Sequence, residues 1–428
     1  MRLFLLWLGC WLLPLLPAYA YSVLTHQANV DSAWKPCLRP ALLRRYPGAT
    51  ADEKHQARAY AYGGAIIQDM GYYPFGAHFF TNLTHYVRTG TFVQVLLAEA
   101  QTRDEYAFAL GALAHYVADN NGHSLGTNKA VAAIYPELAK EHGPVVTFED
   151  APIQHTQVEF SFDVVQVASG RYRSEAYHDF IGFQVAKEVL ERAFVRTYGL
   201  RLGEVFVNVD LAIGSYRFAV SQLLPEITRA AWHYKRAEIN QLSPRARRRD
   251  AVYSYSSRQY RKEYGDKYER PGFSARLLSG LFRALPKVGP LRPFAFHVPT
   301  PEAEKLFRYS FAQTRLRYCE LLGEQTAAGI PPPLPNTDFD TGKLTAPGEY
   351  EKTDETYTEL LLQLDKDKFT ESPPALRTDL LHFFQKGPTT GDKKPEKTIE
   401  ALASLREGNN KPQPKPDEKR ASKSEEKK

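Results

Sequence analysis

The chain has 428 residues, of which 43% are hydrophobic and 12% aromatic, a composition that excludes a disordered or fibrous protein. The length exceeds that of one usual domain, so we expect one large domain with appendages. After residue 20 no stretch is long and apolar enough to cross a membrane, and the net charge of +6 is concentrated in one segment described below.

The first twenty residues have the pattern of a secretory signal peptide. Arg2 precedes the apolar run LFLLWLGCWLLPLLP, and the small-residue exit AYA ends at Ala20. An uncleaved anchor helix is the alternative, but the run is short for a membrane span and contains Pro14 and Pro17. Cleavage after Ala20 predicts a secreted or periplasmic protein that begins at Tyr21.

Helical periodicity dominates the following chain, and convincing period-2 strands are scarce. It is clearest over residues 106–118, 177–198 and 211–239. Helix starts are indicated at Asp150 and Pro152, and helix stops at Gly170 and Gly199. We therefore expect an all-α fold.

A candidate site begins near the mature amino terminus. His26 lies there, and the Gly- and Pro-containing stretch QDMGYYPFGAH supplies Asp69 and His78 from a connection between helices. His85 is an alternative to His78 as the ligand, although we prefer to interpret His85 as an ordinary surface or core histidine. Nitrogen and oxygen ligands without cysteine suit zinc, and several donors with open positions would indicate a catalytic site.

The strongest local signal is HYVADNNGHSLG, residues 115–126. His115 and Asp119 are four residues apart and share one helix face, and His123 follows after NNG, which we expect to end the helix. The preceding FALGALA indicates a buried helix, in which an imidazole and a carboxylate are costly unless something satisfies them. A metal would do so; a hydrogen-bonded His/Asp pair in the core is the alternative.

The same spacing recurs in the next candidate helix. His155 and Glu159, in HTQVE, form a second His/carboxylate pair of the kind that helical bundles use to hold metals. Asp163, one turn later, is expected to support the ligands and not to bind the metal itself.

Positive charge collects late in the chain. Between Lys235 and Arg292 there are fifteen Lys and Arg against five Asp and Glu. Within this basic segment, residues 273–285 have apolar residues at helical spacing. This pattern is typical of an interfacial helix and equally of a helix packed in the core. Residues 245–270 could stack on nucleic acid, but a solvated charged loop is preferred.

The end of the chain changes in composition. A helix-like segment spans residues 302–322, and from Gly387 onward Lys, Glu, Pro and Ser dominate, so this end is expected to be disordered. Cys37 and Cys319 either form a disulfide or stay separate thiols, and they form no metal motif.

These elements occur in the order found in the zinc-dependent phospholipase C family, which the chain resembles over about residues 21–240. That family is similar to secreted bacterial phospholipases C and to the amino-terminal domain of glycosylphosphatidylinositol-specific phospholipase D. Single-strand-specific nucleases are more distant relatives with the same helical fold. The HSLG sequence after Asp119 looks closest to the lipid-cleaving enzymes.

The resemblance implies a site with about three zinc ions. Asp69, His78, His115 and Asp119 would hold one ion, and His123, His155 and Glu159 a second. A third would be held by the backbone amine and carbonyl of Tyr21 together with His26 and Asp119. Family members often begin with Trp, so Tyr21 is a departure.

The resemblance and composition together divide the chain into five parts. These are a signal peptide (1–20), a phospholipase C-like helical domain (21–240), a basic Arg/Tyr-rich segment (241–300), a C-terminal helical extension (301–386) and a disordered tail (387–428).

Clustered zinc implies a phosphodiester hydrolase, because zinc activates water and stabilises the oxygens of an in-line displacement. Asp69 is, by resemblance, the residue that orients or deprotonates the water. Phospholipid is the preferred substrate, with a possible anionic membrane surface bound through residues 245–292. Single-strand-specific nuclease activity and a non-catalytic zinc-containing binding protein are the alternatives, and nucleic acid is the less favoured partner.

Overall fold

A computed structural model describes residues 23–168, 182–220, 237, 298–326, 328–389 and 392–409. Most of the described residues are helical, and their β pairing is limited to an isolated bridge between Thr337 and Leu344. The expected all-α fold is confirmed. The signal-peptide residues, Tyr21 and the basic segment from 241 to 297 lie outside the described residues.

The N-terminal part of the chain supplies the helices that carry the candidate site. In chain order its elements are α2 (Val23–Ala33), η1 (Trp34–Leu38), α3 (Arg39–Arg45), α4 (Ala51–Gly64), η2 (Ile67–Tyr72), α5 (His78–Tyr86), α6 (Thr89–Glu99), α7 (Arg103–Asn121), η3 (Gly122–Thr127), α8 (Asn128–Ile134), α9 (Pro136–His142), α10 (Pro152–Ala168), α12 (Lys187–Tyr198), α13 (Leu202–Val205) and α14 (Val209–Phe218).

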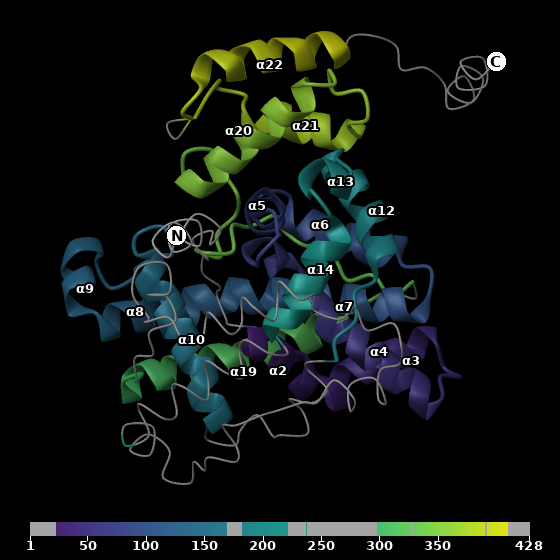
Figure 1. The fold of residues 1–428 in the computed structure, drawn as a ribbon, viewed down its shortest axis with the longest axis vertical. Coiled ribbons are helices and arrows are strands. Elements are labelled where there is room, and N and C mark those ends of the chain that lie inside the picture. Colours follow the sequence, from purple (N-terminus) through teal and green to yellow (C-terminus); the bar gives the residue numbers. More distant parts are fainter. Residues whose placement is uncertain are drawn as a thin grey trace, which may run out of the picture.

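The later helices are α19 (Pro301–Gly323), α20 (Glu351–Asp365), α21 (Pro374–Phe383) and α22 (Pro395–Asn409). Figure 1 shows α20, α21 and α22 together at one end of the molecule, and α2, α3, α4 and α19 at the opposite end. The tyrosine hydroxyl of Tyr318 on α19 donates a hydrogen bond of 2.8 Å to the carbonyl of Leu110 on α7. A disulfide between Cys37 and Cys319 links α19 to η1.

The central element is α7, which is buried along nearly its whole length. Thr102 and Glu105 form a capping box at its start, so the first backbone amides are satisfied. It crosses α4 very closely: a Cβ atom added to Gly111 would lie 2.1 Å from the carbonyl oxygen of Ala61. Glycine is therefore needed at this crossing, and the small residues of FALGALA serve the contact between helices as well as burial.

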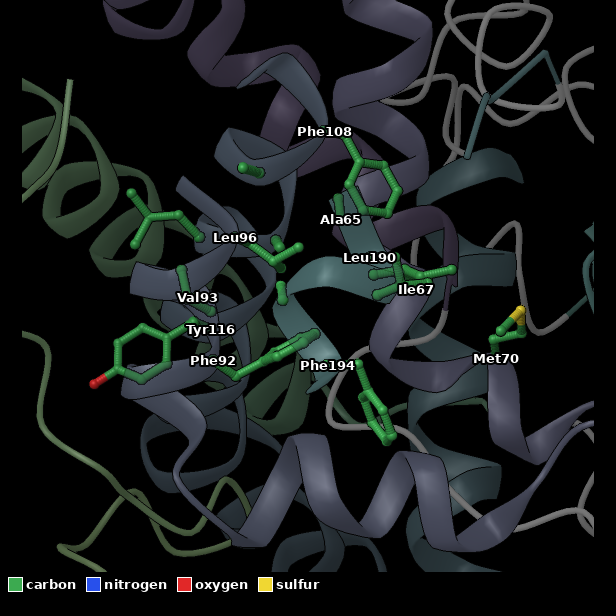
Figure 2. Close-up of a cluster of buried hydrophobic side chains, with 14 of the residues drawn as sticks. Ala65, Ile67, Met70, Phe92, Val93, Leu96, Phe108, Tyr116, Leu190 and Phe194 are labelled. Carbon is green, nitrogen blue, oxygen red and sulfur yellow. The ribbon is translucent and has the colours of Figure 1, made fainter. Parts of the chain in front are cut away.

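The hydrophobic core is shared between the N-terminal and C-terminal parts of the chain. Figure 2 shows side chains from η2, α6, α7 and α12 packed together, among them Phe92, Phe108 and Phe194. The same cluster of buried side chains extends to Leu321 on α19 and Leu405 on α22. The C-terminal helices thus contribute to the core that holds the candidate site in place.

Two helices expected from the sequence are confirmed at their boundaries. α10 begins at Pro152, and α12 ends at Tyr198, directly before Gly199, which has a positive φ of 68° and terminates the helix in the left-handed conformation. α12 begins at Lys187, so the described residues 182–186 of the expected helix 177–198 are not helical. Gly170 and most of the expected helix 211–239 beyond residue 220 lie outside the described residues.

The expectation that the chain is disordered from Gly387 onward is wrong for the residues that form α22. Ala401, Leu402 and Leu405 on this helix are buried, because α20 provides the apolar surface on which one side of α22 packs. The polar composition of the whole tail obscured this short apolar stripe. Residues 410–428 lie outside the described residues.

None of the helices among the described residues combines the length and the apolar character needed to cross a membrane.

Candidate metal centre

Eight buried side chains gather in the interior of the N-terminal part, each at most 3% exposed. They come from α2, η2, α5, α7, η3 and α10, and they are His26, Asp69, His85, His115, Asp119, His123, His155 and Glu159. They form three groups, each with its donor atoms within 4.8 Å of one another, and the first two share His115. The groups are His26 with Asp69 and His115, His85 with His115 and Asp119, and His123 with His155 and Glu159.

Asp119 connects the first two groups. One of its carboxylate oxygens lies 3.3 Å from His26 Nε2, and the other lies 3.3 Å from His85 Nε2 and 3.0 Å from His115 Nε2. Asp69 completes this part of the centre, with one oxygen 3.3 Å from His85 Nε2 and the other 3.9 Å from His26 Nε2. The imidazoles of His26 and His115 stack, with ring centroids 4.2 Å apart.

The third group lies on η3 and α10. His155 Nδ1 is 2.6 Å from Glu159 Oε1, and the rings of His123 and His155 stack with centroids 5.0 Å apart. The helix α7 ends at Asn121, as the sequence predicts, and η3 continues from it as a wider π-helical turn that carries His123.

Neighbouring groups fix the orientation of three imidazoles. Since a carbonyl oxygen can only accept, His115 Nδ1 donates to the carbonyl of Ala65 and His85 Nδ1 donates to that of Thr81, each at 2.9 Å. His155 Nε2 lies 2.8 Å from Oδ1 of Asn128 in the same way. Each ring therefore turns its other nitrogen toward the acidic side chains, an arrangement typical of metal-binding histidines.

The donor set fits zinc. Bonds of about 2.0–2.2 Å in a tetrahedral site put ligand atoms roughly 3.3–3.6 Å apart, and the separations around Asp119 and Asp69 are close to this. Both carboxylate oxygens of Asp69 and of Asp119 are buried with no hydrogen-bond donor within ordinary geometry. Burying such carboxylates is costly without a cation, and nitrogen and oxygen donors without thiolate suit zinc.

The protonation states also follow from burial. Burial holds the pKa of His155 well below its usual value and lowers that of His123, so both imidazoles stay neutral, the form that binds metal. Burial alone would lower the pKa of His85, but the carboxylates of Asp119 and Asp69 outweigh it and raise the pKa to about 10. Burial likewise raises the pKa of Asp119, but the surrounding imidazoles outweigh it and hold the pKa well below its usual range.

The structure separates the two histidines of α5. His78, the expected ligand, lies exposed at the first residue of the helix and belongs to none of the three groups. His85, expected to be an ordinary core or surface histidine, lies between Asp69 and Asp119. Two turns of helix decide the difference, because only the last turn of α5 reaches the carboxylates.

Two further expectations concern the amino terminus. Tyr21 lies outside the described residues, whereas His26 on α2 is part of the centre. Asp163 accepts hydrogen bonds from the backbone amide of Leu24 at 3.0 Å and from the hydroxyl of Thr25 at 2.6 Å. It thus holds the start of α2 against α10, in keeping with a supporting role.

A carboxylate that sequence analysis did not single out also faces the centre. Asp340, from the connection between α19 and α20, is 3% exposed and has Oδ1 3.7 Å from His123 Nε2. Nothing in its spacing along the chain relates it to the histidines, because it lies more than two hundred residues after His123.

Residues 25–207 match the family described as zinc dependent phospholipase C. The matched stretch contains all eight side chains of the three groups and stops before α14, α19 and the later helices. The chain matches no curated protein and no solved structure.

Proposed function

Through residues 25–207 the chain belongs to the zinc-dependent phospholipase C family, and we propose that it is an exported phosphodiester hydrolase that cleaves phospholipid. The observation that carries the proposal is the convergence of five imidazoles and three carboxylates, all at most 3% exposed, in one interior site. Such a set has no structural value that would offset its burial unless cations are bound.

We assign the donors to the ions by proximity. His85 and His115 with Asp69 and Asp119 would hold one zinc ion, so that His85 takes the place expected for His78. The three remaining donors of η3 and α10 would hold a second, and they are His123, His155 and Glu159.

A third ion would be bound by His26 and Asp119 with the amino terminus. Signal-peptide cleavage after Ala20 would leave the amine of Tyr21 two residues before Val23, where α2 begins. The contact of His26 with Asp119 at 3.3 Å supports this arrangement. A count of about three zinc ions follows, together with a requirement for processing, since an amine within a peptide bond cannot ligate.

Zinc, when bound, lowers the pKa of water toward roughly 7 and stabilises the charge on a phosphodiester. The protein's own contribution is to hold and orient. Asp119 fixes three imidazoles at once, and Asp69 presents a carboxylate oxygen that would orient the attacking water and accept its proton. Burial of the surrounding helices excludes bulk water from these groups.

The experiment uses the mature exported protein with its zinc retained. We expect about three zinc ions per chain by elemental analysis and release of a phosphorylated head group and diacylglycerol from phospholipid micelles. Asp69→Asn should lower kcat by roughly 10²–10⁴-fold, whereas His55→Ala, at an exposed position of α4, should behave as wild type.

Single-stranded DNA and RNA are assayed with the same preparation across ionic strength, because attraction to any polyanion weakens with salt. Faster cleavage of nucleic acid at physiological salt would assign the protein to the nucleases. A zinc-loaded protein inert on both substrates would be a binding protein. Intact mass of the exported protein tests the start at Tyr21.

A further inference from the structure

A segment outside the family match covers the metal centre. This capping segment, residues 335–342, lies between α19 and α20. The ring of Phe339 packs edge-on against His85 with centroids 5.1 Å apart. The next residue, Asp340, brings its Oδ1 to 3.7 Å from His123 Nε2. One short segment therefore touches both halves of the centre.

Hydrogen bonds attach the capping segment to the residues that hold the histidines. The amide of Phe339 donates to the carbonyl of His85 at 3.1 Å. The side-chain amide of Asn128 donates to the carbonyl of Asp340 at 2.7 Å, while its Oδ1 lies 2.8 Å from His155 Nε2. Asn128 thereby positions His155 and the capping segment together, so the segment is built into the site.

The carboxylate of Asp340 has a defined orientation. The hydroxyls of Tyr86 and Tyr350 both donate to its Oδ2, at 2.9 and 2.5 Å. Its other oxygen, Oδ1, is the one that faces His123. The two hydroxyls thus hold Oδ2, while Oδ1 lies near an imidazole. This arrangement suits a carboxylate that binds a cation through one oxygen.

The charge of Asp340 also needs a partner. Within the described part of the chain no Lys or Arg forms an ion pair with it, and the ionisable side chain that faces its Oδ1 is the buried imidazole of His123. Two tyrosine hydroxyls share the charge but do not neutralise it. A buried carboxylate in this position is costly unless a cation lies beside it.

We propose that Asp340 binds, through Oδ1, the cation held by His123, His155 and Glu159. The centre is then completed by a residue from outside the domain that defines the family, and the capping segment is part of the metal site. The inference rests on the proposed zinc function, because it assigns a fourth protein donor to one of the proposed ions. Three protein donors would leave a tetrahedral site open, and Asp340 would occupy that position.

The test counts and titrates metal without substrate. Metal-free wild-type protein and Asp340→Asn are reconstituted with zinc, dialysed against graded concentrations of a chelator and analysed for zinc per chain. We expect Asp340→Asn to bind one zinc ion at least about tenfold more weakly, with the other ions unaffected. Asp340→Glu, which retains a carboxylate, should recover part of the affinity.

Asp338→Asn is the matched control. Asp338 lies in the same segment, is equally buried and accepts hydrogen bonds from Thr341, but contacts no histidine of the centre. It should hold zinc as wild type does. Equal losses in Asp338→Asn and Asp340→Asn, or unchanged zinc affinity in Asp340→Asn, would overturn the assignment.

A variant that keeps the carboxylate covers the case in which Asp340→Asn does not fold. Tyr350→Phe removes one hydrogen bond to Oδ2 and should weaken the same zinc ion by a smaller factor. Unchanged affinity in this variant would count against the proposal. Wild-type protein that binds no zinc would refute the proposed function itself, whereas zinc-loaded wild type with unaffected variants refutes only the role of Asp340.

Discussion

Asp119 is the residue on which the first part of the metal centre depends, because its two oxygens face three imidazoles at 3.0–3.3 Å. Its position follows from local chemistry that the sequence expresses directly. His115 and Asp119 share a face of α7 at four-residue spacing, which together with the apolar residues around them indicates a buried His/carboxylate pair, and the family resemblance implies that both bind metal. The same reasoning predicted His155 and Glu159 on α10.

The spacing of residues along a helix does not show which turn of that helix lies closest to the centre. His78 and His85 are seven residues apart, which is nearly two full turns, so both point from the same face of α5 about 10 Å apart along its axis. The ring of Tyr72 even contacts both, with centroids 6.0 Å away. Only tertiary packing, through hydrogen bonds of Thr81 to the backbone of Gln68 and Gly71, brings the His85 end of the helix to Asp69.

His85→Ala should therefore cost zinc and His78→Ala should not. We expect His85→Ala to lose at least one zinc ion per chain and to lower activity by roughly 10²-fold or more, since removing even supporting groups of a metal site costs 10–100-fold. His78→Ala, at an exposed position, should change stability by no more than about 0.5 kcal/mol and keep its zinc. Zinc per chain and phosphodiester hydrolysis are measured on both. The opposite pattern would return the ligand role to His78.

At the scale of elements, the crossing of α4 and α7 sets the position of the histidine pair. The carbonyl that orients His115 belongs to Ala65, immediately after α4, and it reaches the imidazole because Gly64 and Gly111 allow the two helices to touch. The sequence indicated a buried helix here but not its partner, since FALGALA is compatible with many close-packed neighbours. The contact between helices is a property of the folded chain.

Gly111→Ala tests this crossing. Alanine usually stabilises a helix interior by about 1 kcal/mol relative to glycine, but here its Cβ would lie 2.1 Å from the carbonyl of Ala61. We expect a loss of about 1–3 kcal/mol in the free energy of unfolding from overpacking, with weaker zinc binding as His115 moves. Gly203→Ala on α13, whose Cβ would meet nothing within 4 Å, is the control. Thermal unfolding of both variants with zinc bound decides; equal stability would mean that the helices separate at little cost.

At the scale of the whole molecule, the sequence predicted the helical class and most of the centre but not how its ends come together. The family match stops at residue 207, yet Leu321, Leu322 and Leu405 belong to the same buried cluster as side chains of the helices that carry the candidate centre. Composition alone treated residues after 300 as an extension and a tail, because it registers polarity over a segment and not the apolar stripe on one side of a helix. Asp340 is not predicted from the sequence for a related reason: residues that are distant along the chain but close in the fold show no regular spacing.

The disulfide between Cys37 and Cys319 links the N-terminal and C-terminal parts of the chain covalently. It joins η1 to α19 over a sequence separation of 282 residues, with the carbonyl of Leu322 accepting a hydrogen bond from Arg44 nearby. The sequence leaves the pairing of the two cysteines open, because cysteines so far apart along the chain carry no spacing signal.

Replacing both cysteines by serine should lower the free energy of unfolding by about 2–5 kcal/mol, since the bond restricts the unfolded chain. The metal centre lies on other elements, and Tyr318 beside the disulfide keeps its hydrogen bond to Leu110, so zinc per chain at 25 °C should stay as in wild type. Denaturant unfolding and elemental analysis measure the two quantities separately. A double variant that is fully folded at 25 °C but has lost zinc would contradict this prediction. In that case the packing of α19 on α7 is insufficient to keep the ligands in place, and the disulfide itself is required.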